Sequence, residues 1–152
     1  MTAFRLDNKI AVISGAGSGI GRSMALVFAE NGAIVHVVDL NENAAAETVS
    51  LIIKKGGMAY AHACDVSNQE EMITLMDGIQ AQHPINILVN NAGIGFVGNL
   101  ENTSEADFDR LFRVNVKGVY NGMYACLPHL KANGGGVILN TASVASSVAL
   151  PD

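Results

Sequence analysis

The chain has 152 residues, of which 49% are hydrophobic and 15% charged, and its formal net charge is −5. This length allows one domain with a buried core, and the composition excludes a disordered tail or a coiled coil. No run of Lys or Arg could form a nucleic-acid-binding face, and no apolar stretch is long enough to cross a bilayer. We therefore expect a single cytoplasmic domain over residues 1–152 that binds neither nucleic acid nor a membrane.

The two cysteines give no sign of a metal site or a disulfide framework. Cys64 and Cys126 lie far apart in the sequence and lack metal-ligand spacing. The amino terminus has no apolar signal-peptide core, so the expected compartment is reducing. We interpret both thiols as reduced and buried, and we expect no metal.

The first half of the chain is predicted to alternate strands with helices. Residues 10–13 form a short apolar strand, and a glycine-rich turn over 15–21 leads into a helix. Residues 34–38 form a second strand that ends at Asp39, and residues 42–55 form a second helix. Apolar residues at helical spacing are Ile20, Met24, Val27 and Phe28 in the first helix and the inward-facing Val49, Ile52 and Ile53 in the second.

The second half continues this alternation. Ser67 and Glu70 have the spacing of a reciprocal cap that opens a helix through Ile73, Met76 and Ile79. Ser104 with Asp107 opens the longest helix, which runs to about residue 130. The three predicted strands of this half are 58–64, 85–89 and 136–140.

Alternating strands and helices indicate parallel βαβ units with right-handed crossovers. We therefore predict an α/β fold with a doubly wound, Rossmann-like parallel sheet in strand order 3-2-1-4-5. A ligand should bind beyond the carboxyl ends of strands 1 and 4, where the strand order reverses.

The glycine-rich turn is predicted to hold a pyrophosphate. Gly15 would permit a tight turn, Gly19 the close approach of the ligand, and Gly21 the close packing of helix and strand. Backbone amides and the positive end of the helix dipole would then bind the phosphates.

Asp39 is a second and independent signal. A carboxylate at the end of strand 2 can accept hydrogen bonds from both hydroxyl groups of an adenosine ribose, and it would repel the extra phosphate of NADP. Neither Ser18 nor Leu40 is basic, and Arg22 lies inside the helix, where we expect a structural role. The predicted cofactor is NAD.

Five motifs, in order along the chain, resemble those of the short-chain dehydrogenase/reductase family. They are Ser14-Gly15-x-x-x-Gly19-x-Gly21, Asp65-Val66, Asn90-Asn91-Ala92-Gly93, Asn115 in the long helix, and Ser143 after the fifth strand. The resemblance covers the whole chain. It implies an oxidoreductase that interconverts an alcohol and a carbonyl by hydride transfer, with a small-molecule alcohol or carbonyl as its substrate.

The same resemblance assigns the site residues. Ser143 would donate a hydrogen bond to the substrate oxygen, Asn115 would hold a water of the proton relay, and Asn90 would stabilise the sheet. The residues expected at the cofactor are Gly15, Ser18, Gly19, Ile20, Gly21, Asp39, Leu40, Asp65, Val66, Asn91, Ala92 and Gly93.

The long helix also predicts a contact between subunits. Asn115 shares an apolar stripe with Phe108, Leu111, Phe112, Val119 and Met123, so we expect this stripe to face inward. Val114, Val116, Tyr120 and Tyr124 lie off the stripe and need another partner. Because strand 5 should also be a sheet edge, we expect a homo-oligomer formed through the 104–130 helix, a dimer or a higher species, or else a poorly soluble product.

The family's Tyr-x-x-x-Lys motif does not occur in this sequence, since none of the three tyrosines has Lys four residues later. We therefore expect an inactive fragment whose fold is incomplete at the carboxyl end. A non-catalytic NAD-binding or regulatory protein is the alternative, although it would need neither Ser143 nor Asn115. These two residues also disfavour a nucleotide-binding methyltransferase. The sequence does not determine the substrate or the physiological direction.

Overall fold

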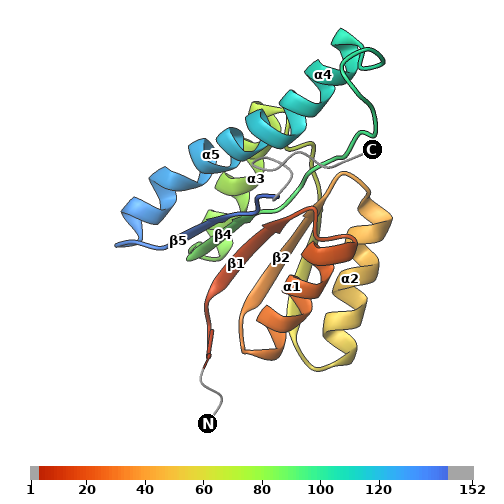
Figure 1. Cartoon of the computed structure of the whole chain (residues 1–152). Coiled ribbons are helices and arrows are strands. Elements are labelled where there is room, and N and C mark those ends of the chain that lie inside the picture. Colours follow the sequence, from red (N-terminus) through yellow and green to blue (C-terminus); the bar gives the residue numbers. More distant parts are fainter. Residues whose placement is uncertain (1–3, 144–152) are drawn as a thin grey trace.

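The structure, a computed structural model, describes residues 4–143. Its centre is a five-stranded parallel sheet in the order β3-β2-β1-β4-β5, as predicted, with helices on both faces (Figure 1). In chain order the elements are β1 (Ile10–Ser14), α1 (Gly19–Glu30), β2 (Ile34–Asp39), α2 (Glu42–Lys54), β3 (Met58–Ala63), α3 (Gln69–Gln82), β4 (Ile87–Asn90), α4 (Glu105–Phe112), a π-helical turn (Arg113–Lys117), α5 (Gly118–Ala132) and β5 (Val137–Asn140).

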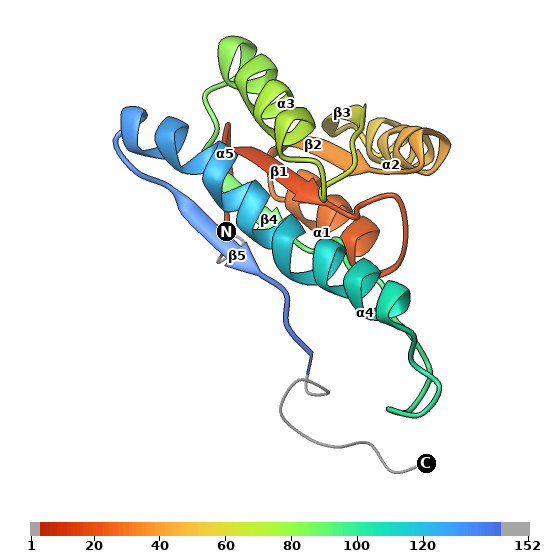
Figure 2. The same cartoon turned by 90° about the horizontal axis from the view of Figure 1, so that it is seen from above.

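Strand β1 is the centre of the core because both of its faces are covered. All five of its residues are buried. Ile10 and Val12 point toward α3 and α5, whereas Ala11 and Ile13 point toward α1 and α2. Figure 2 shows the two helical layers on opposite sides of the sheet. This alternation of buried side chains on both faces is typical of a parallel sheet between two layers of helices.

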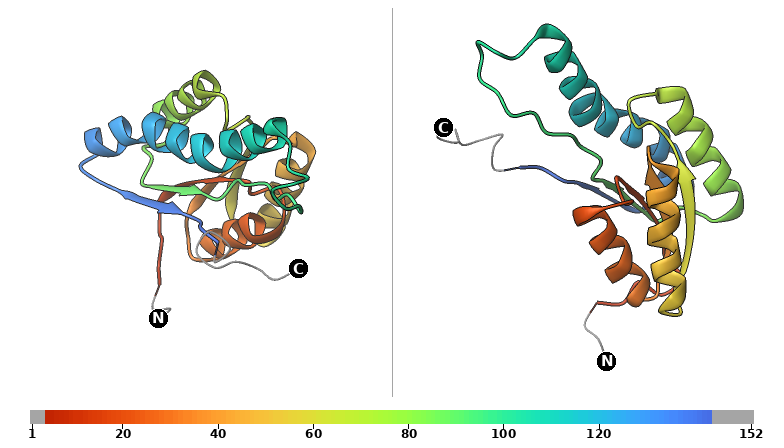
Figure 3. Two further views of the ribbon diagram at one scale, coloured as in Figure 1. Left: turned by 45° about the horizontal axis from the view of Figure 1, so that its top comes forward. Right: turned by 90° about the vertical axis from the view of Figure 1, so that its right-hand side faces the viewer.

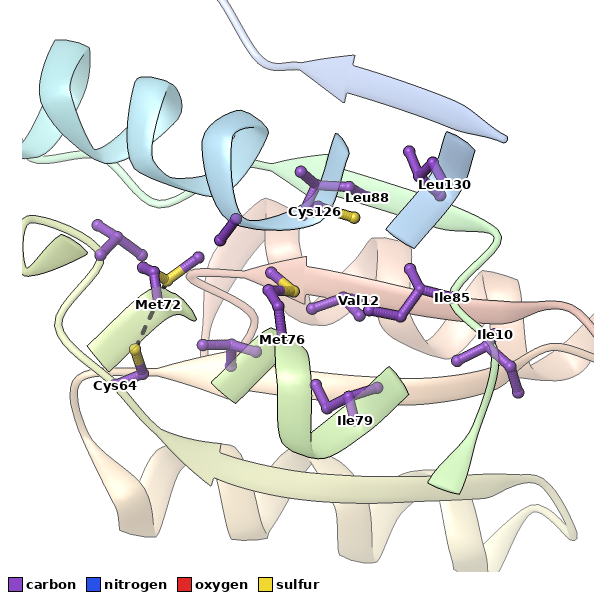
Figure 4. Packing of buried hydrophobic residues seen from close by; sticks show 13 residues of the cluster. Ile10, Val12, Cys64, Met72, Met76, Ile79, Ile85, Leu88, Cys126 and Leu130 are labelled. Carbon is purple, nitrogen blue, oxygen red and sulfur yellow. Dashed lines mark hydrogen bonds between the residues drawn. The ribbon is translucent and has the colours of Figure 1, made fainter. Parts of the chain in front are cut away.

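The core between the sheet and the α3–α5 layer contains both cysteines (Figure 4). The sulfur of Cys64 lies 3.5 Å from that of Met72. Both thiols are buried and unpaired, as predicted, and burial raises the pKa of each to about 11. They are therefore protonated side chains of the core at neutral pH.

On the opposite face, α1 packs through small residues. Its buried positions are Gly21, Ala25 and Ala29, while Ile20 and Val27 are exposed. In α2, Ile52 is buried as predicted, but Ile53 is 57% exposed, so the prediction that it faces inward was wrong. Small side chains let α1 approach the sheet closely, and this approach positions the glycine-rich turn.

The cap of α3 is one residue later than predicted. Asn68, rather than Ser67, is the first flanking residue, and its side chain accepts hydrogen bonds from the amides of Glu70 and Glu71. Glu71 in turn accepts one from the Asn68 side-chain amide. An Asn carbonyl can cap a helix as well as a Ser hydroxyl can, so the spacing alone could not decide between neighbouring positions.

The predicted helix over 104–130 is interrupted by the π-helical turn. Ser104 caps its start as expected, accepting a hydrogen bond from the Asp107 amide. The predicted inward stripe was wrong, because Phe108 and Phe112 are exposed and Val114 packs against the core instead. The π turn shifts the phase of the helix, and α4 extends beyond the sheet (Figure 3). The buried face of α5 consists of Gly118, Asn121, Gly122, Ala125, Cys126 and Leu130.

No helix within residues 4–143 is both long enough and apolar enough to span a membrane.

Three of the four histidines, His36, His62 and His83, gather with Tyr60 against α3, and none of them lines the cleft at the carboxyl ends of β1 and β4. His36 is 3% exposed, and its Nδ1 lies 2.8 Å from Nε2 of His62. The His36 ring also lies against those of Tyr60 and His83, at centroid distances of 5.1 and 5.2 Å. Burial, and then the two neighbouring imidazoles, lower the pKa of His36 from 6.5 to about 3.

This cluster predicts a loss of stability in acid. Below about pH 6.5 the unfolded chain binds a proton at His36 that the folded chain does not bind until about pH 3. The free energy of unfolding should therefore fall by up to about 1.4 kcal/mol per pH unit as the pH decreases through this window. Urea unfolding at pH 7, 6 and 5 measures the slope. The substitution His36→Val should flatten it, whereas His129→Gln on α5 should not, and equal slopes in all three proteins would contradict the assignment.

Candidate functional site

One cleft, of about 430 Å³, opens at the carboxyl ends of the central strands. It lies at the reversal of strand order between β1 and β4, where ligands bind in open α/β sheets. All twelve residues expected at a cofactor line it, together with three that the sequence analysis did not single out for the site, Cys64, Ile94 and Val114. These three come from the segments that directly precede or follow the predicted motifs, or from the long helix.

The glycine-rich turn forms one wall of the cleft. Gly15 has a φ of +63°, which favours glycine and allows the chain to turn sharply after β1. A Cβ on Gly21 would overlap the carbonyl oxygen of Gly15 and crowd the Asn91 side chain. The predicted roles of these two glycines in turning and in close packing are thus confirmed as local geometry.

The backbone amides in the first turn of α1 do not donate hydrogen bonds to the side chain of the N-cap residue. Ser18 makes no side-chain cap hydrogen bond, and the turn has no acidic residue. The starts of α2, α3 and α4, in contrast, are each capped by a side chain. The amides at the start of a helix carry partial positive charge, so the start of α1, which lines the cleft, gives it a region of positive potential.

Asp39 lines the cleft beside the glycine-rich turn, and its carboxylate is fixed by two backbone amides. Gly17 N donates to Oδ2 at 2.9 Å, and Asn41 N donates to Oδ1 at 3.0 Å. Each carboxylate oxygen can still accept a further hydrogen bond. The charge is therefore held in one orientation at the edge of the cleft.

Arg22 does not line the cleft. Its Nε donates to the carbonyl oxygen of Gly17 and to the hydroxyl of Thr48, each at 3.0 Å, and its guanidinium pairs with Glu47. The predicted structural role is confirmed. Among the described residues that line the cleft, none is basic.

The wall at Asp65 and Val66 is supported from α5. The side-chain amide of Asn121 donates to the Val66 carbonyl at 2.8 Å, and Asn121 is completely buried. Gly118 faces the Val66 side chain so closely that a Cβ would lie 2.8 Å from Cγ2. The sequence analysis missed Asn121, because a lone Asn inside a helix carries no motif.

The turn after β4 is tied to the end of β1. The Ser14 hydroxyl accepts hydrogen bonds from the amides of Asn91 and Ala92, at 3.0 and 3.1 Å. The Asn91 side chain donates to the carbonyl oxygens of Ser14 and Gly15. Asn90 is buried and donates to Asn140 on β5, which agrees with its expected role in the sheet.

Asn115 lies in the π-helical turn and is exposed. Its Oδ1 accepts from Ile94 N at 2.8 Å, and its Nδ2 donates to Ile94 O at 2.9 Å. The expectation that it points into the core was wrong, because the amide pairs with the backbone that follows Gly93. This reciprocal pair holds the loop after β4 against the helix.

Ser143 lies three residues after β5 and is exposed. It does not line the cleft. The structure therefore brings together all twelve residues predicted to line a cofactor site, whereas neither predicted catalytic residue lines the cleft: Asn115 lies in the π-helical turn and bonds to Ile94, and Ser143 follows β5.

A sequence model of the family described as short chain dehydrogenase matches residues 9–152. An uncharacterized oxidoreductase from Thermotoga maritima is 43% identical over 145 residues, which are 95% of this chain and 57% of that protein. The 7alpha-hydroxysteroid dehydrogenase of Escherichia coli K12 is 41% identical over 93% of this chain and 56% of its own length. The chain thus spans little more than half the length of these relatives.

Solved structures show the same fold. A 7 alpha-hydroxysteroid dehydrogenase in complex with NADH and 7-oxo glycochenodeoxycholic acid matches with a TM-score of 0.91 and 39% identity, over 96% of this chain and 57% of that one. A metagenomic short-chain oxidoreductase in complex with NADP matches with a TM-score of 0.89 and 33% identity, over 95% and 66% of the two chains. These neighbours include complexes with both forms of the nicotinamide cofactor.

The contact at Gly21 can be tested by adding one methyl group. Gly21→Ala should lower the free energy of unfolding by about 1–3 kcal/mol, because α1 must move away from the turn. Gly78→Ala is the matched control, since a Cβ there meets no atom within 4 Å. It should be neutral or stabilising in the same urea titration. An equal change in the free energy of unfolding for the two substitutions would show that stability does not depend on the close packing of α1 against the glycine-rich turn.

Proposed function

The chain belongs to the short-chain dehydrogenase family, and we propose that it supplies the NAD-binding site of an oxidoreductase that interconverts an alcohol and a carbonyl compound. The observation that carries the proposal is the cleft itself. Its lining combines an uncapped helix start with a carboxylate that backbone amides hold in one orientation. Activity, substrate and partners belong to the whole protein and are part of the proposal.

The residues present fit a dinucleotide. The amides of the first turn of α1 would hold the pyrophosphate, because they are uncapped and carry partial positive charge. Asp39 would accept hydrogen bonds from the two hydroxyl groups of the adenosine ribose. Asp65 and Val66 would border the adenine, while Asn91, Ala92 and Gly93 would line the path toward the nicotinamide.

Bound NAD supplies hydride transfer at its nicotinamide ring. Ser143 would donate a hydrogen bond to the substrate oxygen; its position after β5, beside the strand β4 that leads into the cleft, supports this role. Asn115 would hold a water, because its side-chain oxygen and amide each have one hydrogen-bonding position beyond those used by Ile94.

The preference for NAD over NADP rests on charge. A phosphate on the adenosine ribose would approach the Asp39 carboxylate, and among the described residues no cation lines the cleft to compensate. Arg22, the nearest cation to the turn in sequence, is already bonded to Gly17, Glu47 and Thr48. Moving it to a phosphate would break these contacts.

This preference predicts the effect of removing the carboxylate. The unaltered protein should bind NAD more tightly than NADP, and Asp39→Ala should weaken NAD binding by about 10- to 100-fold, the range for a hydrogen bond to a charged group. It should also narrow the gap between the two cofactors. Isothermal titration calorimetry measures both dissociation constants. Asp77→Asn removes a charge from α3 and should leave their ratio unchanged, and NADP binding as tight as NAD in the unaltered protein would refute the proposal.

We also propose that the protein forms a homo-oligomer through α4 and α5. An exposed apolar stripe runs along these helices at intervals of three or four residues. Its members, each 42–60% exposed, are Phe108, Phe112, Val116, Tyr120, Tyr124 and Leu127. β5, which is the outer strand of the sheet within residues 4–143, exposes Val137 and Leu139 as well. A second copy of the chain could cover this stripe, because a two-fold axis would pack the stripe of one subunit against the same stripe of the other.

Charged substitutions in this stripe should separate the subunits. Tyr120→Asp combined with Tyr124→Asp should move the weight-average mass in sedimentation equilibrium to that of one subunit, because two charges would be buried in an apolar contact. Ile53→Asp, at an exposed apolar position on α2, is the control and should leave the mass unchanged. An unaltered protein that sediments as a monomer at all concentrations would overturn the proposed contact.

A further inference from the structure

Thr48 on α2 is completely buried, although its side chain is polar. Its hydroxyl lies 3.0 Å from the carbonyl oxygen of Ala16 and 3.4 Å from that of Gly17. The carbonyl of Ala44, one turn back in its own helix, lies at 3.2 Å, so the oxygen of the glycine-rich turn is the nearest acceptor. The hydroxyl also accepts a hydrogen bond from Arg22 Nε at 3.0 Å.

Arg22 completes the arrangement from α1. Its guanidinium donates to the Gly17 carbonyl through Nε and through a terminal nitrogen. The side chain is only 26% exposed, whereas its ion-pair partner Glu47 is 64% exposed. The exposed ion pair contributes little, so the contacts with the turn and with Thr48 are the ones that fix the guanidinium.

The two carbonyl groups determine where two amides point. A trans peptide is planar, and its C=O and N–H groups point in opposite directions. The peptide whose carbonyl belongs to Ala16 carries the amide of Gly17, and that amide donates to Asp39 at 2.9 Å on the other side. By the same geometry, the peptide whose carbonyl belongs to Gly17 directs the amide of Ser18 away from the Arg22 guanidinium, and Ser18 lines the cleft.

We propose that Thr48 and Arg22 are positioning residues for the dinucleotide: Thr48 holds the carbonyl group of Ala16 and Arg22 holds that of Gly17, so that the amides of the same peptides face Asp39 and the cleft. Neither side chain lines the cleft. The part of the proposal that concerns a ligand rests on the proposed function, whereas the part that concerns the turn stands on the hydrogen bonds alone.

The substitution Thr48→Val tests the proposal because it keeps the shape of the side chain and removes the hydroxyl. Without ligand, hydrogen–deuterium exchange of the Gly17 amide should become about tenfold faster, the effect of losing roughly one hydrogen bond. The dissociation constant for NAD should rise by a similar factor, about tenfold. That for adenosine, measured by NMR titration, should rise less, since adenosine has no phosphate to bind the Ser18 amide. Thr48→Ser, which retains the hydroxyl, should restore both values.

Two further variants separate positioning from general stability. Thr74→Val makes the same chemical change on α3, outside the cleft, and should alter neither the exchange nor the ratio of the NAD and adenosine constants. Arg22→Met should weaken NAD binding in the same direction as Thr48→Val, and it provides the test if Thr48→Val does not fold. Unchanged exchange over residues 15–21 together with unchanged NAD affinity in Thr48→Val would overturn the inference. If the unaltered protein does not bind NAD, the proposed function fails, while the exchange experiment still decides whether the two side chains hold the turn.

Discussion

The close approach of α1 to the end of β1 is the constraint on which the rest of the site depends. At Gly21 the helix comes so near the Gly15 carbonyl that no side chain would fit. The Asn91 side chain occupies the remaining space and bonds to the carbonyls of Ser14 and Gly15. One contact thus joins the first strand, the first helix and the turn after β4, and the cleft is the space that these three segments enclose.

The walls of the cleft are held mainly by backbone groups and by polar side chains behind them. Two amides fix Asp39, and Asn115 fixes the loop at Ile94. Behind these walls, Asn121 bonds to the Val66 carbonyl and Thr48 to the glycine-rich turn. Groups held in this way need little rearrangement when a ligand binds, and such preorganisation favours affinity. Because no basic residue lines the cleft within the described residues, the proposed phosphate binding would depend on amides and on the helix dipole.

Several features of the fold followed from local patterns. Strand order, the cap at Ser104 and the positions of Gly15 and Gly21 could be predicted because each depends on a few neighbouring residues or on a general rule of chain topology. The inward stripe of the long helix could not be predicted. A period of 3.6 residues assumes an uninterrupted α-helix, and the π-helical turn over Arg113–Lys117 breaks that assumption. The prediction that Ile53 faces inward was wrong for a different reason. An apolar residue next to the buried face of a helix can remain exposed at its margin.

The sequence by itself determined most of the residues that gather at the cleft, because the carboxyl ends of parallel strands meet at one edge of the sheet and the family resemblance picked out the residues that follow them. Only the tertiary structure decided how those residues are held. Asn121, Thr48 and Arg22 act across pairs of elements that are distant along the chain, so no local spacing reveals them. Asn115 was found from its place in a motif, but its pairing with Ile94 depends on where α4 and the loop before it lie. Hydrogen bonds between distant segments depend on how the helices and strands pack together, and the residues of one segment do not determine that packing.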